Sequence, residues 1–137
     1  MFISSFFSSF PFLTSFAVVV KSKPMCQLET IRQALPEGTP AVEESGMPKG
    51  GKMFEEDNFS SGMLILPPGA TKFTEVASST EVFFVVAGAR NTLEICIHNT
   101  TWLLSRGDNF FVPRGNVYLL KNRSDTESIK LYFTLVK

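Results

Sequence analysis

Apolar residues in the second half of the chain recur at the spacing of β-strands. Residues 128–136 alternate, so that Ile129, Leu131, Phe133 and Leu135 share one face. Further apolar segments bounded by turn-forming residues are predicted as strands: residues 62–66, 81–87, 92–98, 101–104, 110–112 and 117–121. About eight short strands at spacings of roughly 8–12 residues predict an all-β sandwich or barrel.

Two of these segments carry apolar residues on both faces. Residues 81–87 form a continuous apolar run after Glu81, which predicts a strand buried on both sides, and residues 101–104 are similar. The second side could be covered by another subunit, or by the chain's own second sheet and the residues before Met53. The candidate dimer face consists of Phe83, Val85, Trp102 and Leu104.

The first half of the chain carries weaker patterns. Residues 1–23 form an apolar leader, and residues 24–35 predict a short helix that begins at Pro24 and ends before Pro36. The helix prediction depends on the i, i+3, i+7 spacing of Leu28, Ile31 and Leu35. Residues 37–52 are rich in Gly and Pro and predict a linker, so residues 24–52 precede a packed domain over residues 53–137.

The sequence leaves the role of the apolar leader open. Residues 1–20 have no charge, but serines, a threonine and Pro11 interrupt them and no basic segment precedes them. They are a targeting or anchor segment, a non-folding leader, or an extension produced by the position of the start codon. Asn-x-Ser/Thr sequons at Asn58, Asn99 and Asn122 would matter only in a secreted chain.

Composition narrows the classes of partner. The 137 residues support one domain, and 13 basic residues balance 13 acidic ones. Neither nucleic acid nor an anionic membrane is favoured by such a charge balance. Cys26 and Cys96 form no motif and favour two separate thiols over a disulfide.

The second half of the chain contains a segment rich in turn-forming residues. Gly107 opens residues 107–122, and Pro113, Gly115 and Asn116 predict the turn of a β-hairpin, because Pro fixes φ and Gly and Asn accept positive φ. With Asn122, these residues resemble the second cupin motif, G-x5-P-x-G-x2-H-x3-N. Tyr118 stands at the histidine position.

The first cupin motif, G-x5-H-x-H-x3-E-x6-G, also fits the chain in spacing. It begins at Gly69 and ends at Gly88, with Glu75, Ala77 and Glu81 at the intervening fixed positions. The two motifs together imply the cupin double-stranded β-helix, a jelly-roll barrel. In cupin enzymes these positions supply three His and one Glu to a divalent metal.

The residues present do not suit that metal. Alanine cannot ligate, and tyrosine, with an ordinary pKa of about 10, is a poor ligand for a divalent ion. We therefore expect no metal, no cofactor and no catalytic residue. Cys96 and His98 could pair as nucleophile and base, but a plain strand face is favoured. Acid-base carboxylates could come from Glu55, Glu56, Asp57, Glu75 or Glu81, of which the first three form a charge run typical of a solvated surface.

Within the cupins, three segments resemble the C-terminal domain of the centromere protein C family: residues 58–69, 81–86 and 108–122. That family also has Tyr at the position of Tyr118. The resemblance, over about residues 54–137, implies a homodimerisation module of an inner kinetochore protein in the nucleus. It also implies other kinetochore proteins as partners and at most indirect contact with centromeric chromatin, because the family's basic nucleosome-binding motif is absent.

Two alternatives remain, a small metal-dependent or secreted cupin enzyme and a metal-free cupin that binds a small molecule near Glu75, Glu81, Arg114 and Tyr118.

Overall fold

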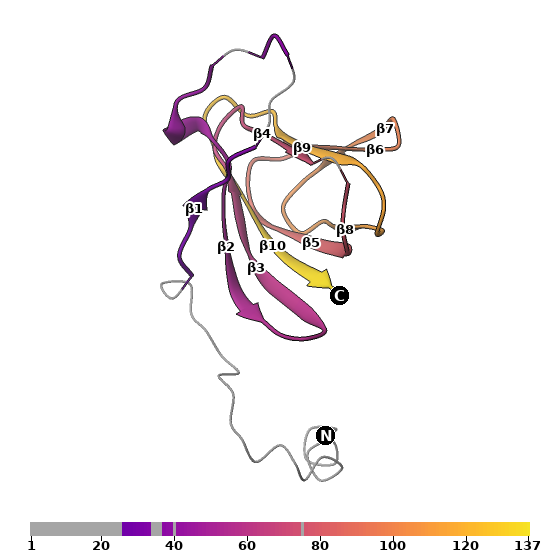
Figure 1. Ribbon diagram of the computed structural model, residues 1–137. Helices are drawn as coiled ribbons and strands as arrows, with labels where there is room; N and C mark the ends of the chain where they lie inside the picture. Colours follow the sequence, from indigo (N-terminus) through magenta and orange to yellow (C-terminus); the bar gives the residue numbers. More distant parts are fainter. Residues whose placement is uncertain (1–25, 34–36, 40, 75) are drawn as a thin grey trace, which may run out of the picture.

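Two antiparallel β-sheets form the molecule, as the computed structural model shows for residues 26–33, 37–39, 41–74 and 76–137 (Figure 1). The six-stranded sheet has the order β1-β2-β3-β10-β5-β8, with bounds Glu29–Thr30, Lys49–Glu55, Phe59–Leu66, Ile129–Val136, Thr80–Ala87 and Asn109–Val112. The four-stranded sheet has the order β4-β9-β6-β7, with bounds Thr71–Thr74, Tyr118–Asn122, Leu93–Ile97 and Thr100–Leu104. The predicted all-β jelly roll is confirmed.

The core lies between the two sheets and follows the predicted alternation. On β10, Ile129 and Leu131 are fully buried, and Phe133 packs against the same cluster. The four-stranded sheet contributes Leu93, Ile95 and Leu120. Each of these strands therefore turns one face inward, as a period of two requires.

Strand β5 departs from the prediction of burial on both faces. Phe83 and Val85 are 2% and 1% exposed and belong to the core, whereas Val82 and Phe84 are 41% and 44% exposed on the outer face. Phe83 and Val85 are therefore wrong as members of a dimer face, because successive side chains of a strand point to opposite sides of the sheet. On the outer face, the candidates from β5 are Val82 and Phe84.

The predicted hairpin over residues 107–122 is also wrong in its pairing. Strand β8 pairs with β5 in one sheet, and β9 pairs with β4 and β6 in the other. The turn at Pro113 thus forms a corner between the sheets. Gly115 donates its backbone N–H to the Ala77 carbonyl at 2.8 Å, and Ala77 donates to the Asn116 carbonyl at 2.9 Å.

The turn glycines have the predicted conformation. Gly107 and Gly115 have φ of 95° and 88°, which glycine adopts without steric cost. Asn116 is not among the residues with positive φ, and its side-chain amide instead donates to the Pro113 carbonyl at 2.8 Å. Asn116 therefore supports the turn through its side chain.

The predicted helix over residues 24–35 is not formed in its described part, residues 26–33. Glu29 and Thr30 form β1 and pair with Lys49 and Gly50 of β2. Residues 49–52, which the sequence places in a linker, form the first half of β2 and pair with β3. Extended pairing with an open sheet edge has overridden the local periodicity. One short 3₁₀ helix, η2, spans Glu44–Gly46.

Residues 26–33 join the two sheets along their open side. Ile31 donates its backbone N–H to the Pro48 carbonyl at 2.8 Å, next to β2. The side-chain amide of Gln33 donates to the Thr71 carbonyl at 2.7 Å and accepts from the Phe73 N–H at 2.8 Å, on the edge strand β4. We call residues 26–33 the strap.

Candidate functional site

The structure brings together two of the four degenerate metal-ligand positions. Glu81 lies near the start of β5 and Tyr118 at the start of β9, and the Tyr118 hydroxyl donates to Glu81 Oε1 at 2.6 Å. Ala77 is buried and pairs through its backbone with the Gly115 turn. Glu75 lies outside the described residues. The contact between Glu81 and Tyr118 joins the two sheets.

A residue that the sequence analysis missed completes this group. Lys72 on β4 donates from Nζ to the Tyr118 hydroxyl oxygen at 3.0 Å, and Nζ lies 4.9 Å from the centre of the Tyr118 ring. A hydrogen-bonded chain therefore runs from Lys72 through Tyr118 to Glu81. The signal in the sequence is a single charged residue within the otherwise uncharged strand of residues 71–74.

An aromatic cluster lies beside Tyr118. The ring of Phe83 lies 5.9 Å from the ring of Tyr118 and stacks on Phe110 at 4.9 Å. Phe133 lies 6.5 Å from Phe83 on the adjacent strand. The buried ring of Tyr118 thus lies beside an apolar cluster, whereas Lys72 and Glu81 at the two ends of the polar chain are partly exposed.

Burial and charge act in opposite directions on Lys72. Removal from water lowers the pKa of its ammonium group, and the Glu81 carboxylate partly offsets this by raising it. Nζ thus has a charged partner in Glu81, reached through the Tyr118 hydroxyl.

The described side chains at these positions lack the usual ligands of a divalent metal. Among the described residues, no group of three or more His, Cys, Asp or Glu side chains could hold a metal ion. Cys96 and His98 do not share a strand face, because β6 ends at Ile97 and His98 lies in the following turn with φ of 51°. Both the alternative of a nucleophile-base pair and the favoured plain strand face assumed that His98 lies on the strand with Cys96, and that assumption is wrong.

Asn122 is a structural anchor. It is fully buried, and its side-chain Nδ2 donates to the carbonyls of Leu66, Pro67 and Glu127 at 3.0, 3.1 and 2.8 Å. Its Oδ1 accepts from the Ser124 N–H at 2.9 Å. The sequon at Asn122 is therefore inaccessible in the folded chain.

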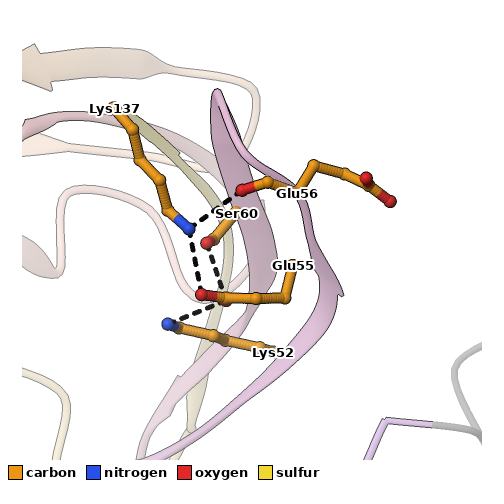
Figure 2. Close-up of polar contacts among 5 residues, drawn as sticks. All are labelled: Lys52, Glu55, Glu56, Ser60 and Lys137. Carbon is orange, nitrogen blue, oxygen red and sulfur yellow. Dashed lines mark hydrogen bonds and ion pairs between the residues drawn. The ribbon is translucent and has the colours of Figure 1, made fainter.

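A second polar cluster holds the end of β10 to the β2–β3 hairpin (Figure 2). Glu55 accepts from Lys52 and from Lys137, each at 2.9 Å, and from the buried Ser60 hydroxyl at 2.7 Å. Lys137 also donates to the Glu56 carbonyl at 2.9 Å. The hydrogen bond from Lys52 lowers the pKa of Glu55 most, followed by those from Ser60 and Lys137, to about 2. We call this group the Glu55 clamp.

The outer face of the six-stranded sheet carries exposed apolar side chains in register. Phe111 pairs with Val82 across β8 and β5, and Phe84 pairs with Tyr132 across β5 and β10. All four are exposed, with Phe111 at 59%. The outer apolar patch consists of Val82, Phe84, Phe111, Tyr132 and Val136.

The remaining dimer-face candidates lie on the other sheet. Trp102 is 45% exposed on the edge strand β7, and Leu104 packs against the core. They are therefore separate from the outer apolar patch. No helix within the described residues is long and apolar enough to cross a membrane.

Comparison with known proteins identifies a matching family model and related sequences. A family model described as Mif2/CENP-C like matches residues 49–135. Centromere protein C of Homo sapiens is 40% identical over 87 residues, which are 63% of this chain and 9% of that protein. Inner kinetochore subunit cnp3 of Schizosaccharomyces pombe is 31% identical over 80 residues, which are 58% of this chain and 12% of that protein. The match thus spans about a tenth of the length of these two relatives.

Solved structures agree on the fold. The Schizosaccharomyces pombe Cnp3 cupin domain superposes with a TM-score of 0.59 at 27% identity, covering 66% of this chain and 61% of that one. An RmlC-like cupin from Shewanella frigidimarina gives a TM-score of 0.67 at 15% identity, covering 88% and 91%. The second likeness concerns the fold alone. Together they confirm the predicted cupin jelly roll.

Proposed function

The chain belongs to the Mif2/CENP-C like family, and from this membership we propose that it is a non-catalytic homodimerisation module of an inner kinetochore protein. Its place is the nucleus, at the centromere, where it supports kinetochore assembly with other kinetochore proteins. Contact with centromeric chromatin is indirect or uses regions outside this chain. The names of the relatives, centromere protein C and inner kinetochore subunit cnp3, support this setting.

The observation that carries the dimerisation proposal is the outer apolar patch. Exposed large apolar side chains are normal when scattered, but contiguous ones on a flat sheet indicate an interaction surface. Here Val82 and Phe84 on β5 lie beside Phe111 on β8 and Tyr132 on β10. A second copy of the same patch is complementary in chemistry, and pairing about a twofold axis closes the assembly.

The absence of catalysis is proposed from the polar groups at the degenerate metal positions. At two of those positions, the Tyr118 hydroxyl donates to Glu81 and accepts from Lys72, and the ring of Tyr118 lies 5.9 Å from that of Phe83. A general acid or base must reach a substrate atom, whereas these groups are directed at each other. The arrangement supports a scaffold role.

The test is the mass of the 137-residue chain in solution, measured by light scattering after size exclusion. We expect a dimer at micromolar concentration, and we expect the double variant Phe84→Asp/Tyr132→Asp to be a monomer, because four carboxylates would face one another in the dimer. Val117→Asp is the matched control, since Val117 is an exposed apolar residue outside the patch. It should remain dimeric.

A variant at the rival face separates the two surfaces. Trp102→Asp alters the exposed aromatic of β7 and leaves the outer apolar patch intact. If it yields monomers while Phe84→Asp/Tyr132→Asp stays dimeric, the interface lies on β7 and the outer patch is not the dimer face. A wild-type monomer up to high micromolar concentration would contradict dimerisation altogether. Circular dichroism confirms that each variant is folded.

A further inference from the structure

We propose that the ammonium group of Lys72 serves as the internal cation of this cupin, in the structural role that a divalent metal ion has in metal-binding cupins. It holds Glu81 and Tyr118 in place and thereby ties the two sheets together. This inference is independent of dimerisation, because it concerns the interior of one subunit.

The geometry supports a cation-centred tie. Lys72 comes from β4 and Tyr118 from β9, both in the four-stranded sheet, and Glu81 comes from β5 in the six-stranded sheet. Lys72 Nζ and Glu81 Oε1 both bond to the Tyr118 hydroxyl oxygen, at 3.0 and 2.6 Å. Positive charge, neutral hydroxyl and negative charge thus follow one another across the space between the sheets.

The strand register explains how Lys72 reaches this position. Lys72 is the partner of Leu120 across β4 and β9, and Tyr118 lies two residues before Leu120 on the same face. Leu120 is fully buried, so this face points into the core. A long side chain at position 72 can therefore reach the Tyr118 hydroxyl, and Nζ also lies near the ring face of Tyr118 at 4.9 Å.

The same arrangement disfavours a metal ion. A divalent cation bound by Glu81 and Tyr118 would lie close to the Lys72 ammonium group, and like charges at such a separation repel. The tyrosine would also have to give up its proton, which it shares with Glu81 in a 2.6 Å hydrogen bond. Burial lowers the pKa of Lys72, and the nearby Glu81 carboxylate favours the charged form.

The test is a double-mutant cycle on the full chain, read as the thermal unfolding midpoint. Lys72→Met keeps the length of the side chain and removes its charge, and Glu81→Gln removes the opposite charge. We expect each single variant to lose roughly 5 °C or more, because it leaves its partner's charge uncompensated. The double variant should lose clearly less than the sum of the two, since it removes both charges.

Lys121→Met is the matched control, because Lys121 is an exposed lysine on β9. It should shift the midpoint by about 1 °C or less. Additive losses in the cycle, or a harmless Lys72→Met, would overturn the proposal. Light scattering on the same samples reports oligomeric state separately, so a failure of the dimer proposal is distinguishable from a failure here.

A metal titration supplies the second readout. Manganese chloride or EDTA should leave the unfolding midpoint of the wild-type chain unchanged within about 1 °C, because the cation is built into the protein. Stabilisation by manganese, or a midpoint that falls on addition of EDTA, would show that a metal ion still occupies the site and would refute the role of Lys72.

Discussion

At the residue scale, the strongest single-residue dependence is expected at Asn122. Its side chain donates to three carbonyls, those of Leu66, Pro67 and Glu127, and accepts from Ser124, all at or near the end of β3 and the loop before β10. Asn122→Ala would remove the side-chain donor to the carbonyls of Leu66 and Glu127, whereas the Pro67 carbonyl still accepts from the Ala70 N–H at 3.0 Å. We expect it to lower the free energy of unfolding by about 3 kcal/mol, measured by urea denaturation.

Asn116→Ala is the natural control for Asn122. Asn116 also bonds backbone carbonyls, those of Pro113 and Arg114, but in an exposed turn where water can replace it. Its loss should cost less than about 1 kcal/mol. If both variants lower the free energy of unfolding by the same amount, burial of the Asn122 side chain does not increase its contribution to stability.

Glu55 gives a pH-dependent prediction. Bonds from Lys52, Ser60 and Lys137 lower its pKa from 4.5 to about 2 in the folded chain. The Glu55 clamp therefore contributes stability above pH 4.5, and that contribution is lost as the pH falls towards 2, because the unfolded chain takes up the proton first.

The titration midpoint of Glu55 can be measured by NMR, from the chemical shift of its side-chain carboxyl carbon as a function of pH. We expect the Lys52→Met variant to titrate at a higher pH than wild type, and Lys49→Met, at the start of β2, to leave the midpoint unchanged. Because Glu55 is exposed, its effect on stability should be small and weaker at high salt. An ordinary titration midpoint near 4.5 would contradict the clamp.

The sequence predicts part of the candidate site at this scale. The spacing of the two cupin motifs places Glu81 and Tyr118 at ligand positions, and in the structure their side chains meet between the sheets. Lys72 belongs to no motif, and a single lysine in a short strand more often lies on a solvated face. Its role depends on the register between β4 and β9, which the sequence does not specify.

At the element scale, the strands with clear alternation or apolar runs are predicted correctly, and the elements that need a distant partner are not. Within residues 26–33, an extended segment replaces the predicted helix, and Ile31 packs against the core from that segment. Strands β1, β2 and β4 lack a distinctive pattern and form by pairing with β2, β3 and β9. Pairing partners that are distant in sequence leave little local signal.

Turn chemistry has the same limit. Pro113, Gly115 and Asn116 correctly predict a tight turn, yet strands β8 and β9 enter different sheets. The dimer-face prediction on β5 failed in a related way, because an apolar run conceals which alternate residues face the core. Only the register of β5 with β10 and β8 assigns Phe83 inward and Phe84 outward.

The strap gives a prediction for the edge of β4. The Gln33 amide bonds both the Thr71 carbonyl and the Phe73 N–H, as a neighbouring strand would. Gln33→Ala should therefore expose this edge and raise the hydrogen-exchange rate of the Phe73 amide about tenfold, equivalent to about 1.4 kcal/mol. Gln27→Ala, also within the strap but with an exposed side chain, should leave that rate unchanged. Equal exchange in Gln33→Ala and wild type would show that the strap does not protect β4.

At the scale of the whole molecule, the two faces of the six-stranded sheet differ in exposure. The inner face supplies one wall of the core, including Leu64, Val85 and Leu131. The outer face keeps Phe84, Tyr132 and Phe111 accessible. If a second subunit covers that face as proposed, a subunit of this size gains additional apolar burial, and dimerisation and stability are then linked.

This linkage gives the last prediction. If the dimer forms through the outer apolar patch and the unfolded chain is monomeric, mass action requires the unfolding midpoint to rise with protein concentration. We expect an increase of several degrees between about 1 and 100 µM for wild type, measured by scanning calorimetry. The Phe84→Asp/Tyr132→Asp variant should unfold at a lower midpoint that does not depend on concentration, whereas Val117→Asp should keep the wild-type dependence. A wild-type midpoint that is independent of concentration while light scattering shows a dimer would mean that the subunits associate without stabilising the fold, and the patch would then not bury the area that the proposal requires.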